Sequence, residues 1–316
     1  SELAAGTYTV GEVAQPGWTQ TSPAGGGSSD PNGFNVAKLS QFDLSAFSGG
    51  NTSGNDITGY VSPSGREYAI IGLSHGTGYI DVTNPSNPSI VAFVLGPDEG
   101  LPATTHHETA ESHVHLDKGA STWRDIKTFA QHAYVTNETS GGLQVVDLTQ
   151  IDSGVVTSVG TLTDSGLQTA HNIAINPDSG FAYLLGANIA AGGLVVVDLA
   201  TNPAAPTIVG TWSERYLHDA EIVSYTSGPS AGREIAYGFA ETEGLKVIDV
   251  TDKAAMVTLA TVPYPNVTYS HYGTLSTDQQ HLFVNDELDE RDSAGVSTTT
   301  TYVFDISTPA TPAFLS

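Results

Sequence analysis

The chain has 316 residues, no cysteine and a formal net charge of −24, because 34 acidic residues stand against 10 basic ones. A surface this acidic repels phosphate backbones, so nucleic acid is not expected as a partner. No apolar run approaches the roughly 18 residues of a membrane-spanning helix, so no transmembrane segment is expected.

The N-terminal residues differ in composition from the rest. Residues 1–33 are rich in Gly, Ser and Pro, which is typical of a flexible arm. From there on, short β-branched runs alternate with turn residues, and no long amphipathic pattern of helical period is present. We therefore expect an arm at 1–33 and one all-β domain at 34–316.

A short apolar run ending in aspartate recurs five times in this domain. The aspartates are spaced 66, 51, 51 and 56 residues apart. A period near 50 residues built from short strands is the signature of a β-propeller. We predict an all-β propeller with five detectable blades, which either form a complete small ring or belong to a larger one. The five aspartates are Asp81, Asp147, Asp198, Asp249 and Asp305.

A polar doublet opens each repeat just before a strand. Because the inner strands of a propeller line its axis, residues at equal repeat positions are expected to face a common point. The doublets are Asn55-Asp56, Arg124-Asp125, His171-Asn172, His218-Asp219 and His271-Tyr272.

Three of these doublets begin with histidine, at His171, His218 and His271. Imidazoles from successive blades are suitable ligands for one divalent Zn, Mn, Cu or Fe ion. The alternative is that each histidine bonds to backbone or water at the channel mouth. We predict a metal ion on a histidine-lined axis.

The first repeat is lengthened by an inserted loop at 97–120 that is rich in histidine. His113 and His115 lie two residues apart, which places both imidazoles on one side of an extended segment. This spacing suits metal chelation and gives a second candidate metal site. An ordinary polar loop would have a similar composition.

An acidic run at 285–292 gives a third candidate site. Dense carboxylates beside an asparagine can supply the oxygen ligands of a Ca²⁺ ion, although the spacing is not that of an EF-hand. Asp286 is the candidate metal ligand and Glu287 the candidate base or ligand near the axis. The alternative is a solvated acidic turn.

Several phrases of the sequence resemble the LVIVD-repeat proteins grouped as the choice-of-anchor B family. The resemblance implies a secreted or cell-surface β-propeller, without implying a particular reaction. It rests on residues 65–73, 81–88, 123–127, 170–174, 218–220, 232–235 and 285–290.

Two functional hypotheses follow. The first is a secreted or cell-surface module that binds a metal ion on its axis and uses the ring to bind an extracellular ligand or partner. The second is a metal-dependent lyase or hydrolase acting on an acidic polysaccharide or another anionic substrate. In the second hypothesis Arg124 binds a carboxylate of the substrate, and Asp219 or Glu287 moves a proton.

Overall fold

The computed structural model describes residues 38–97, 120–294, 296–298 and 300–316. The chain divides into two compact units, Ser1–Gln41 and Phe42–Ser316, and all described strands belong to the second. The arm predicted at 1–33 lies outside the described residues, as does most of the loop predicted at 97–120, including His113 and His115.

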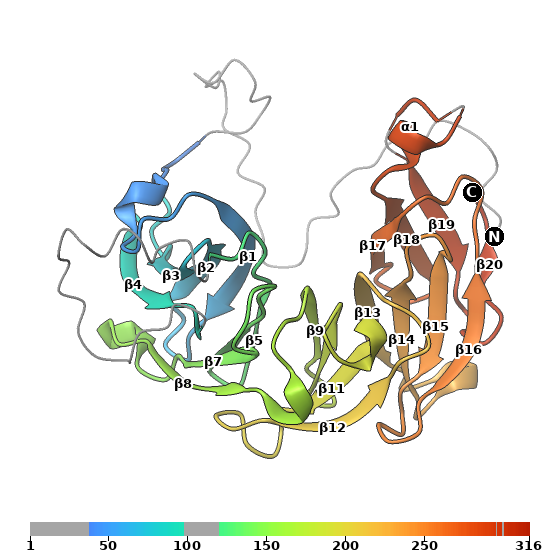
Figure 1. Ribbon diagram of the computed structural model, residues 1–316, viewed down its shortest axis with the longest axis horizontal. Helices are drawn as coiled ribbons and strands as arrows, with labels where there is room; N and C mark the ends of the chain where they lie inside the picture. The colour runs from blue at the N-terminus through green and yellow to red at the C-terminus, as the bar shows by residue number, and fades with distance from the viewer. Residues whose placement is uncertain (1–37, 98–119, 295, 299) are drawn as a thin grey trace. The chain divides into compact units, whose positions relative to one another are not determined.

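The described residues form five antiparallel sheets of four strands each, and every sheet joins strands that are consecutive in the chain (Figure 1). The first sheet contains β1 (Gly54–Val61), β2 (Glu67–Leu73), β3 (Gly76–Asp81) and β4 (Ser89–Leu95). The second contains β5 (Ile126–Phe129), β6 (His132–Val135), β7 (Leu143–Asp147) and β8 (Thr157–Leu162). The third contains β9 (Asn172–Asn176), β10 (Phe181–Leu185), β11 (Leu194–Asp198) and β12 (Thr207–Trp212).

The fourth and fifth sheets repeat this meander. The fourth contains β13 (Asp219–Ser224), β14 (Glu234–Phe239), β15 (Leu245–Asp249) and β16 (Val257–Val262). The fifth contains β17 (Ser270–Leu275), β18 (His281–Asp286), β19 (Thr301–Asp305) and β20 (Ala313–Phe314). The one described α-helix is the short α1 (Asp289–Asp292), and no helix among the described residues has the length and apolar character of a membrane span. The predicted all-β fold with five blade repeats is confirmed.

The five repeated aspartates all end the third strand of a sheet, as their spacing predicts. Each one accepts a hydrogen bond from a backbone N–H two or three residues further on, such as Thr83 N–H to Asp81 and Thr149 N–H to Asp147. The same bond occurs at Asp198, Asp249 and Asp305. A carboxylate that captures this N–H turns the chain away from the strand direction. The aspartate is therefore the residue that ends the strand.

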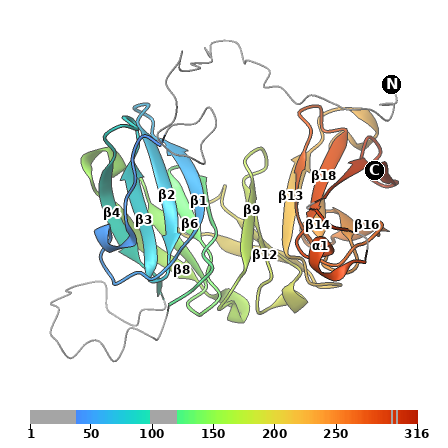
Figure 2. The ribbon, with the colours of Figure 1, turned by 90° about the horizontal axis from the view of Figure 1, so that it is seen from above.

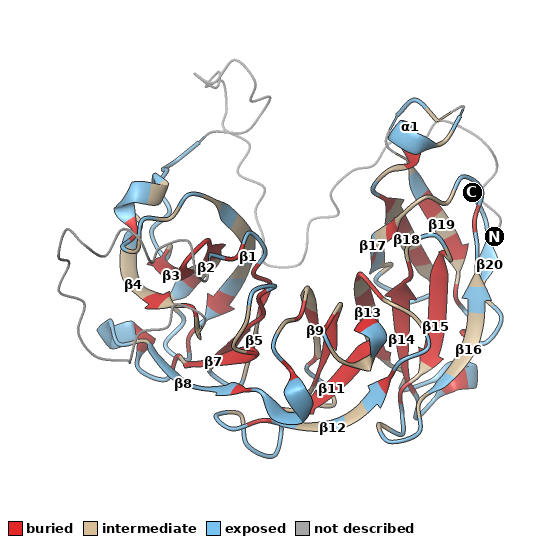
Figure 3. Ribbon diagram, viewed as in Figure 1, coloured by how far each residue is buried: buried red, intermediate tan, exposed pale blue. Residues whose placement is uncertain are grey.

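In the three inner sheets the apolar run before the aspartate is buried on both faces, because each of these sheets is packed between two others. In β11, Val195 and Val197 belong to the core shared with the second sheet, whereas Leu194 and Val196 belong to the core shared with the fourth. All four side chains are inaccessible to solvent, and Figure 3 shows burial concentrated in the strands. Full burial of one such side chain contributes roughly 1.5–3 kcal/mol. This explains why the third strands are apolar at consecutive residues instead of alternating with polar ones.

The stacking of the sheets brings their first strands together. β1 packs beside β5, β5 beside β9, β9 beside β13, and β13 beside β17 (Figures 1 and 2). The polar doublets lie at the start of these strands, so the packing of the cores behind them determines how the doublets meet.

A buried charge network joins the third and fourth sheets. Glu234 is 6% exposed and accepts hydrogen bonds from the Tyr183 hydroxyl at 2.6 Å and the Asn176 amide at 2.8 Å. The Lys253 ammonium lies 2.8 Å from its second oxygen. Removing one member of such a network leaves its partners buried without compensation.

We expect Glu234→Ala to lower the free energy of unfolding by about 3–5 kcal/mol, because it removes the carboxylate that pairs with the Lys253 ammonium and the Tyr183 hydroxyl. Urea denaturation followed by circular dichroism measures this change. Glu67→Ala, at an exposed residue of β2, serves as the control and should change stability by less than about 0.5 kcal/mol. Similar stabilities for the two variants would show that the network does not hold the sheets together.

Candidate functional site

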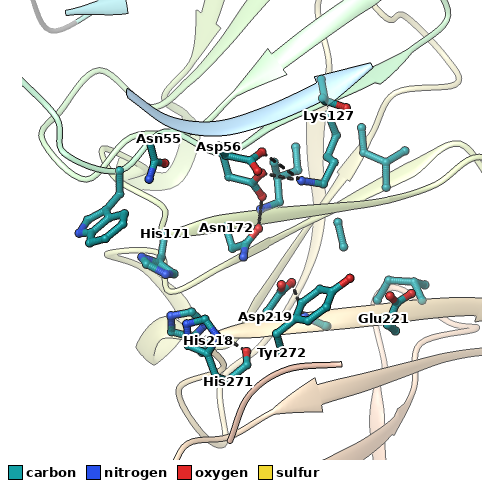
Figure 4. Close-up of a pocket in the computed structure, with 18 of the residues that line it drawn as sticks. Asn55, Asp56, Lys127, His171, Asn172, His218, Asp219, Glu221, His271 and Tyr272 are labelled. Atoms are coloured by element: carbon teal, nitrogen blue, oxygen red, sulfur yellow. Dashed lines mark hydrogen bonds and ion pairs between the residues drawn. The ribbon is translucent and has the colours of Figure 1, made fainter. Parts of the chain in front are cut away.

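A pocket of about 940 Å³ lies along the first strands and is lined by residues of all five sheets (Figure 4). Every residue of the five doublets except Arg124 lines this pocket. Residues two apart on one strand share a face, so Thr58, Lys127, Ala174 and Glu221 line it as well. The doublets therefore do meet at one place, as their equal repeat positions predict.

The three histidines of the doublets form a row along the pocket. The ring centroids of His171 and His218 are 4.2 Å apart, and those of His218 and His271 are 3.9 Å apart. Trp123 continues the row, with its ring centroid 6.4 Å from that of His171. The rings are tilted against one another by 59° and 34° within the histidine row, so they pack partly face to face.

Hydrogen bonds fix how two of these rings are protonated. The Nδ1 atom of His218 lies 3.1 Å from the backbone oxygen of His271. A carbonyl oxygen only accepts, so Nδ1 carries the proton and Nε2 of the neutral ring keeps its lone pair. His171 Nδ1 lies 2.6 Å from a carboxylate oxygen of Glu138, which selects the same tautomer. His271 Nε2 lies 3.7 Å from Glu287.

The central histidine stays neutral over most of the acid range. Burial, followed by the neighbouring His171 and His271, lowers the pKa of His218 to about 3. Burial also lowers the pKa of His271, against the opposing effect of Glu287. Neutral imidazole is the form that binds metal ions.

The side chains in their present orientations are not aimed at a common ion. Among the described residues, no group of three or more His, Asp or Glu side chains is arranged to hold a metal ion. The ring planes of the histidine row face one another, and their nitrogens meet protein partners instead. Metal binding at this row therefore stays a prediction, and it requires the rings to rotate.

The second residues of the doublets form a carboxylate layer that ties neighbouring sheets together. Asp56 accepts a hydrogen bond from Ile126 N–H at 3.3 Å, and Asp125 accepts one from Ile173 N–H at 2.8 Å. The Lys127 ammonium lies 2.5 Å from Asp125 and 3.6 Å from Asp56. Burial, followed by the hydrogen bond with Asp56, raises the pKa of Asp125 to about 7.

Two further carboxyls on β13 face the same pocket. Burial raises the pKa of Asp219 to about 6, although the Ala220 N–H, Lys127, His171 and Asn172 all act in the opposite direction. Burial, and then the nearby Asp219, raises the pKa of Glu221 to about 7. The lower part of the pocket is thus acidic and poorly hydrated, with Lys127 as the basic side chain among its lining residues.

The structure does not bring Arg124 into the pocket. Its side chain is fully buried, and its guanidinium donates to the backbone oxygens of Leu73 at 2.9 Å and Ser74 at 3.3 Å. The lack of a side chain at Gly72 lets the Arg124 backbone approach the first sheet closely, because a Cβ atom there would lie 2.7 Å from the Arg124 carbonyl oxygen. Arg124 therefore anchors the second sheet to the first, and its predicted contact with a substrate carboxylate has no support from this placement.

Asp286 is likewise placed away from the pocket. It is 2% exposed and accepts hydrogen bonds from the backbone N–H groups of Thr268, Tyr269 and Leu288, and from the Tyr264 hydroxyl. Burial would raise its pKa, but these bonds together leave the pKa of Asp286 below its ordinary value. Its oxygens organise the loop before β17. The Ca²⁺ site predicted at 285–292 stays untested.

Sequence reasoning found Asp219, Glu287 and the three histidines, but it missed several pocket residues. The sequence marks Asp56 and Asp125 only as doublet residues without a role in the site, and alternation along β5 and β13 would have added Lys127 and Glu221. No local signal pointed to Glu138, because its contact with His171 joins two loops that follow different strands.

Comparisons with known proteins agree with the fold. The LVIVD repeat family matches residues 179–213, which span β10 to β12 of the third sheet. No curated protein sequence matches the chain. The predicted LVIVD repeat is thus confirmed at these residues, and the chain has a β-propeller fold.

Solved structures resemble the chain at low sequence identity. Hydrazine synthase from Kuenenia stuttgartiensis is 15% identical, with a TM-score of 0.50, over 81% of this chain and 64% of that one. The periplasmic gluconolactonase PpgL from Pseudomonas aeruginosa is 11% identical, with a TM-score of 0.54, over 82% of this chain and 68% of that one. The chain thus spans about two thirds of the length of both. At these identities the likeness concerns the fold alone.

The buried state of His218 predicts a pH dependence of stability. Its folded pKa of about 3 lies below the unfolded value near 6.5, so between these values only the unfolded state binds the proton. The contribution of His218 to stability is therefore complete above about pH 6.5 and is lost as the pH falls towards 3, by about 1.4 kcal/mol per pH unit.

We expect the stability of the wild-type protein relative to His218→Gln to fall by about 2 kcal/mol between pH 7 and pH 5. Urea denaturation of both proteins in EDTA measures this difference while the effects of the other titrating groups cancel. A difference that does not vary with pH would mean that His218 titrates as an ordinary histidine.

Proposed function

We propose that this protein is an extracellular ligand-binding β-propeller whose pocket holds a divalent transition-metal ion on His171, His218 and His271. The observation that carries the proposal is the histidine row itself. Three imidazoles from three successive sheets lie at the same repeat position, with neighbouring ring centroids 4.2 and 3.9 Å apart.

The partners of the rings support a metal-binding role. A histidine that binds metal usually donates its other N–H to a carboxylate or a backbone oxygen, which fixes the tautomer and orients the ring. His171 has such a partner in Glu138, and His218 has one in the backbone oxygen of His271. Both rings therefore keep Nε2 as the nitrogen available to a metal ion.

Binding needs only local movement. His171 and His271 are partly exposed to the pocket, with 18% and 35% of their side-chain surface accessible, so both rings have room to rotate. His218 is more enclosed and would act as the fixed ligand around which the other two reorient. The carboxylate of Glu287, 3.7 Å from His271 Nε2, is available as a further ligand or as a proton acceptor.

The donor set favours some ions over others. Imidazole nitrogens suit Zn²⁺, Cu²⁺ and Fe²⁺, whereas Mn²⁺ and Ca²⁺ prefer oxygen ligands. Among the metals predicted from the sequence, zinc, copper and iron therefore fit this row best. A calcium ion would have to compete with the protein donors that already surround Asp286.

The charge of the pocket favours a binding module over an enzyme acting on an anionic polysaccharide. Asp56, Asp125, Asp219 and Glu221 line the pocket, against a single lysine. Arg124, the cation that an anionic substrate would require in that hypothesis, is held by backbone oxygens outside the pocket lining. An anionic ligand would meet repulsion here.

The extracellular location rests on the resemblance to secreted and cell-surface LVIVD-repeat proteins and on the matched repeat at 179–213. A high negative charge is compatible with such a location, because repulsion between like-charged molecules opposes aggregation.

We expect the wild-type protein to bind one Zn²⁺ ion at the row. His171→Ala and His271→Ala should each weaken this binding about tenfold or more by removing a ligand, and Glu138→Gln should weaken it about tenfold by releasing the His171 ring. Isothermal titration calorimetry with Zn²⁺ at pH 7.5 measures these affinities.

The matched control is His132→Ala, which removes a histidine of β6 that does not line the pocket. A His113→Ala, His115→Ala double variant separates the row from the second candidate site proposed from the sequence. Zn²⁺ affinities that are the same in the row variants and in His132→Ala would refute the proposal.

A further inference from the structure

A second group of pocket residues lies beside the histidine row and has a different chemistry. Asp219 and Glu221 lie two residues apart on β13 and face the pocket together. Tyr272, on the neighbouring strand β17, lies beside Asp219, and Glu221 lies further along β13 (Figure 4). We call these three residues the carboxyl–tyrosine wall.

Neither carboxyl of this wall forms a direct ion pair among the described residues, although Lys127 acts on both from a greater distance. Asp219 accepts the Ala220 N–H at 2.7 Å and a hydrogen bond from Asn172, both of which are neutral donors. No hydrogen bond or ion pair to the Glu221 carboxyl is found within the part of the chain that the structure describes. Lys127, the basic residue of the pocket, is held 2.5 Å from Asp125 on the opposite wall.

Such a pair is costly to keep ionised. Two carboxyls that are partly removed from water and have no counter-ion disfavour each other's charge. Burial, followed by the nearby Asp219, raises the pKa of Glu221 to about 7, which reflects this cost. A cation placed between them would regain the lost charge interaction, and it would do so in a poorly hydrated site where Coulomb energies are larger than in water.

The surroundings indicate an organic cation instead of a bare metal ion. Tyr272 is 45% exposed and lines the pocket, so its aromatic side chain is accessible to a ligand. Ala220, Ile222 and Ile173 add apolar lining nearby. An ammonium group gains from both a carboxylate and an aromatic face, and its attached carbon chain gains from apolar contact.

We infer that the carboxyl–tyrosine wall binds the ammonium group of an organic primary amine, with the N–H groups donating to Asp219 and Glu221 and the adjoining methylenes against Tyr272. The inference rests on the proposed role of the pocket in ligand binding, but none of the three residues is a proposed metal ligand. The pocket volume of about 940 Å³ is sufficient for a ligand of this kind.

The test compares hexylammonium with 1-hexanol, its uncharged analogue, by isothermal titration calorimetry in buffer containing EDTA. The chelator makes the outcome independent of metal binding. We expect the wild-type protein to bind the amine and to bind the alcohol at least tenfold more weakly, because the alcohol lacks the charge that the two carboxyls require.

Glu221→Gln keeps the shape of the side chain and removes its charge, so it should weaken amine binding about tenfold. Glu67→Gln makes the same change in net charge at an exposed residue of the first sheet and should leave binding unchanged. Tyr272→Leu should weaken binding roughly threefold through loss of the aromatic face.

Two outcomes would overturn the inference. The first is equal binding of amine and alcohol by the wild-type protein, a result that does not depend on whether any variant folds. The second is an equal effect of Glu221→Gln and Glu67→Gln on amine binding. This result would show that the amine is attracted by the overall charge of −24 and not by the carboxyl–tyrosine wall. A wild-type protein that binds the amine but does not bind Zn²⁺ would contradict the metal proposal and leave this inference standing.

Discussion

The burial of both faces of the third strands in the three inner sheets is the constraint on which the rest of the structure depends. Side chains such as Val195 and Val196, neighbours on β11, face different sheets and are fully buried in separate cores. A strand of this kind is stable only between two other sheets, so the blades must stack in chain order. Stacking then places the first strands side by side and brings the polar residues at their starts to one pocket.

The sequence predicts those features that repeat, and it fails where contacts are particular to one blade. The aspartates that end the third strands and the row of three histidines are visible because equal residues recur at equal spacing. Arg124 occupies the doublet position of His171, yet its side chain turns to the backbone oxygens of Leu73 and Ser74. Spacing alone cannot distinguish these two orientations, because the difference depends on the backbone acceptors that another sheet offers to the guanidinium.

The chemistry of the pocket depends on which of its carboxyl groups have hydrogen-bond or ion-pair partners and which do not. The Asp56 and Asp125 carboxyls are engaged by Lys127 and by backbone N–H groups, so they hold the first strands together. No hydrogen bond or ion pair to the Glu221 carboxyl is found among the described residues, and His218 at the centre of the histidine row is neutral at neutral pH. Both features favour a positively charged ligand. One end of the pocket offers nitrogen donors suited to a metal ion, and the other offers carboxyls beside an aromatic ring.

The central claim is that the histidine row binds a transition-metal ion. The most direct measurement is a crystal structure of the Zn²⁺-soaked protein with anomalous data collected at the zinc edge. The account predicts one strong anomalous peak about 2.0–2.1 Å from the Nε2 atoms of His171 and His218, and from a nitrogen of His271 whose ring has turned towards the ion. A peak elsewhere in the molecule, with the three rings still packed against one another, would contradict it.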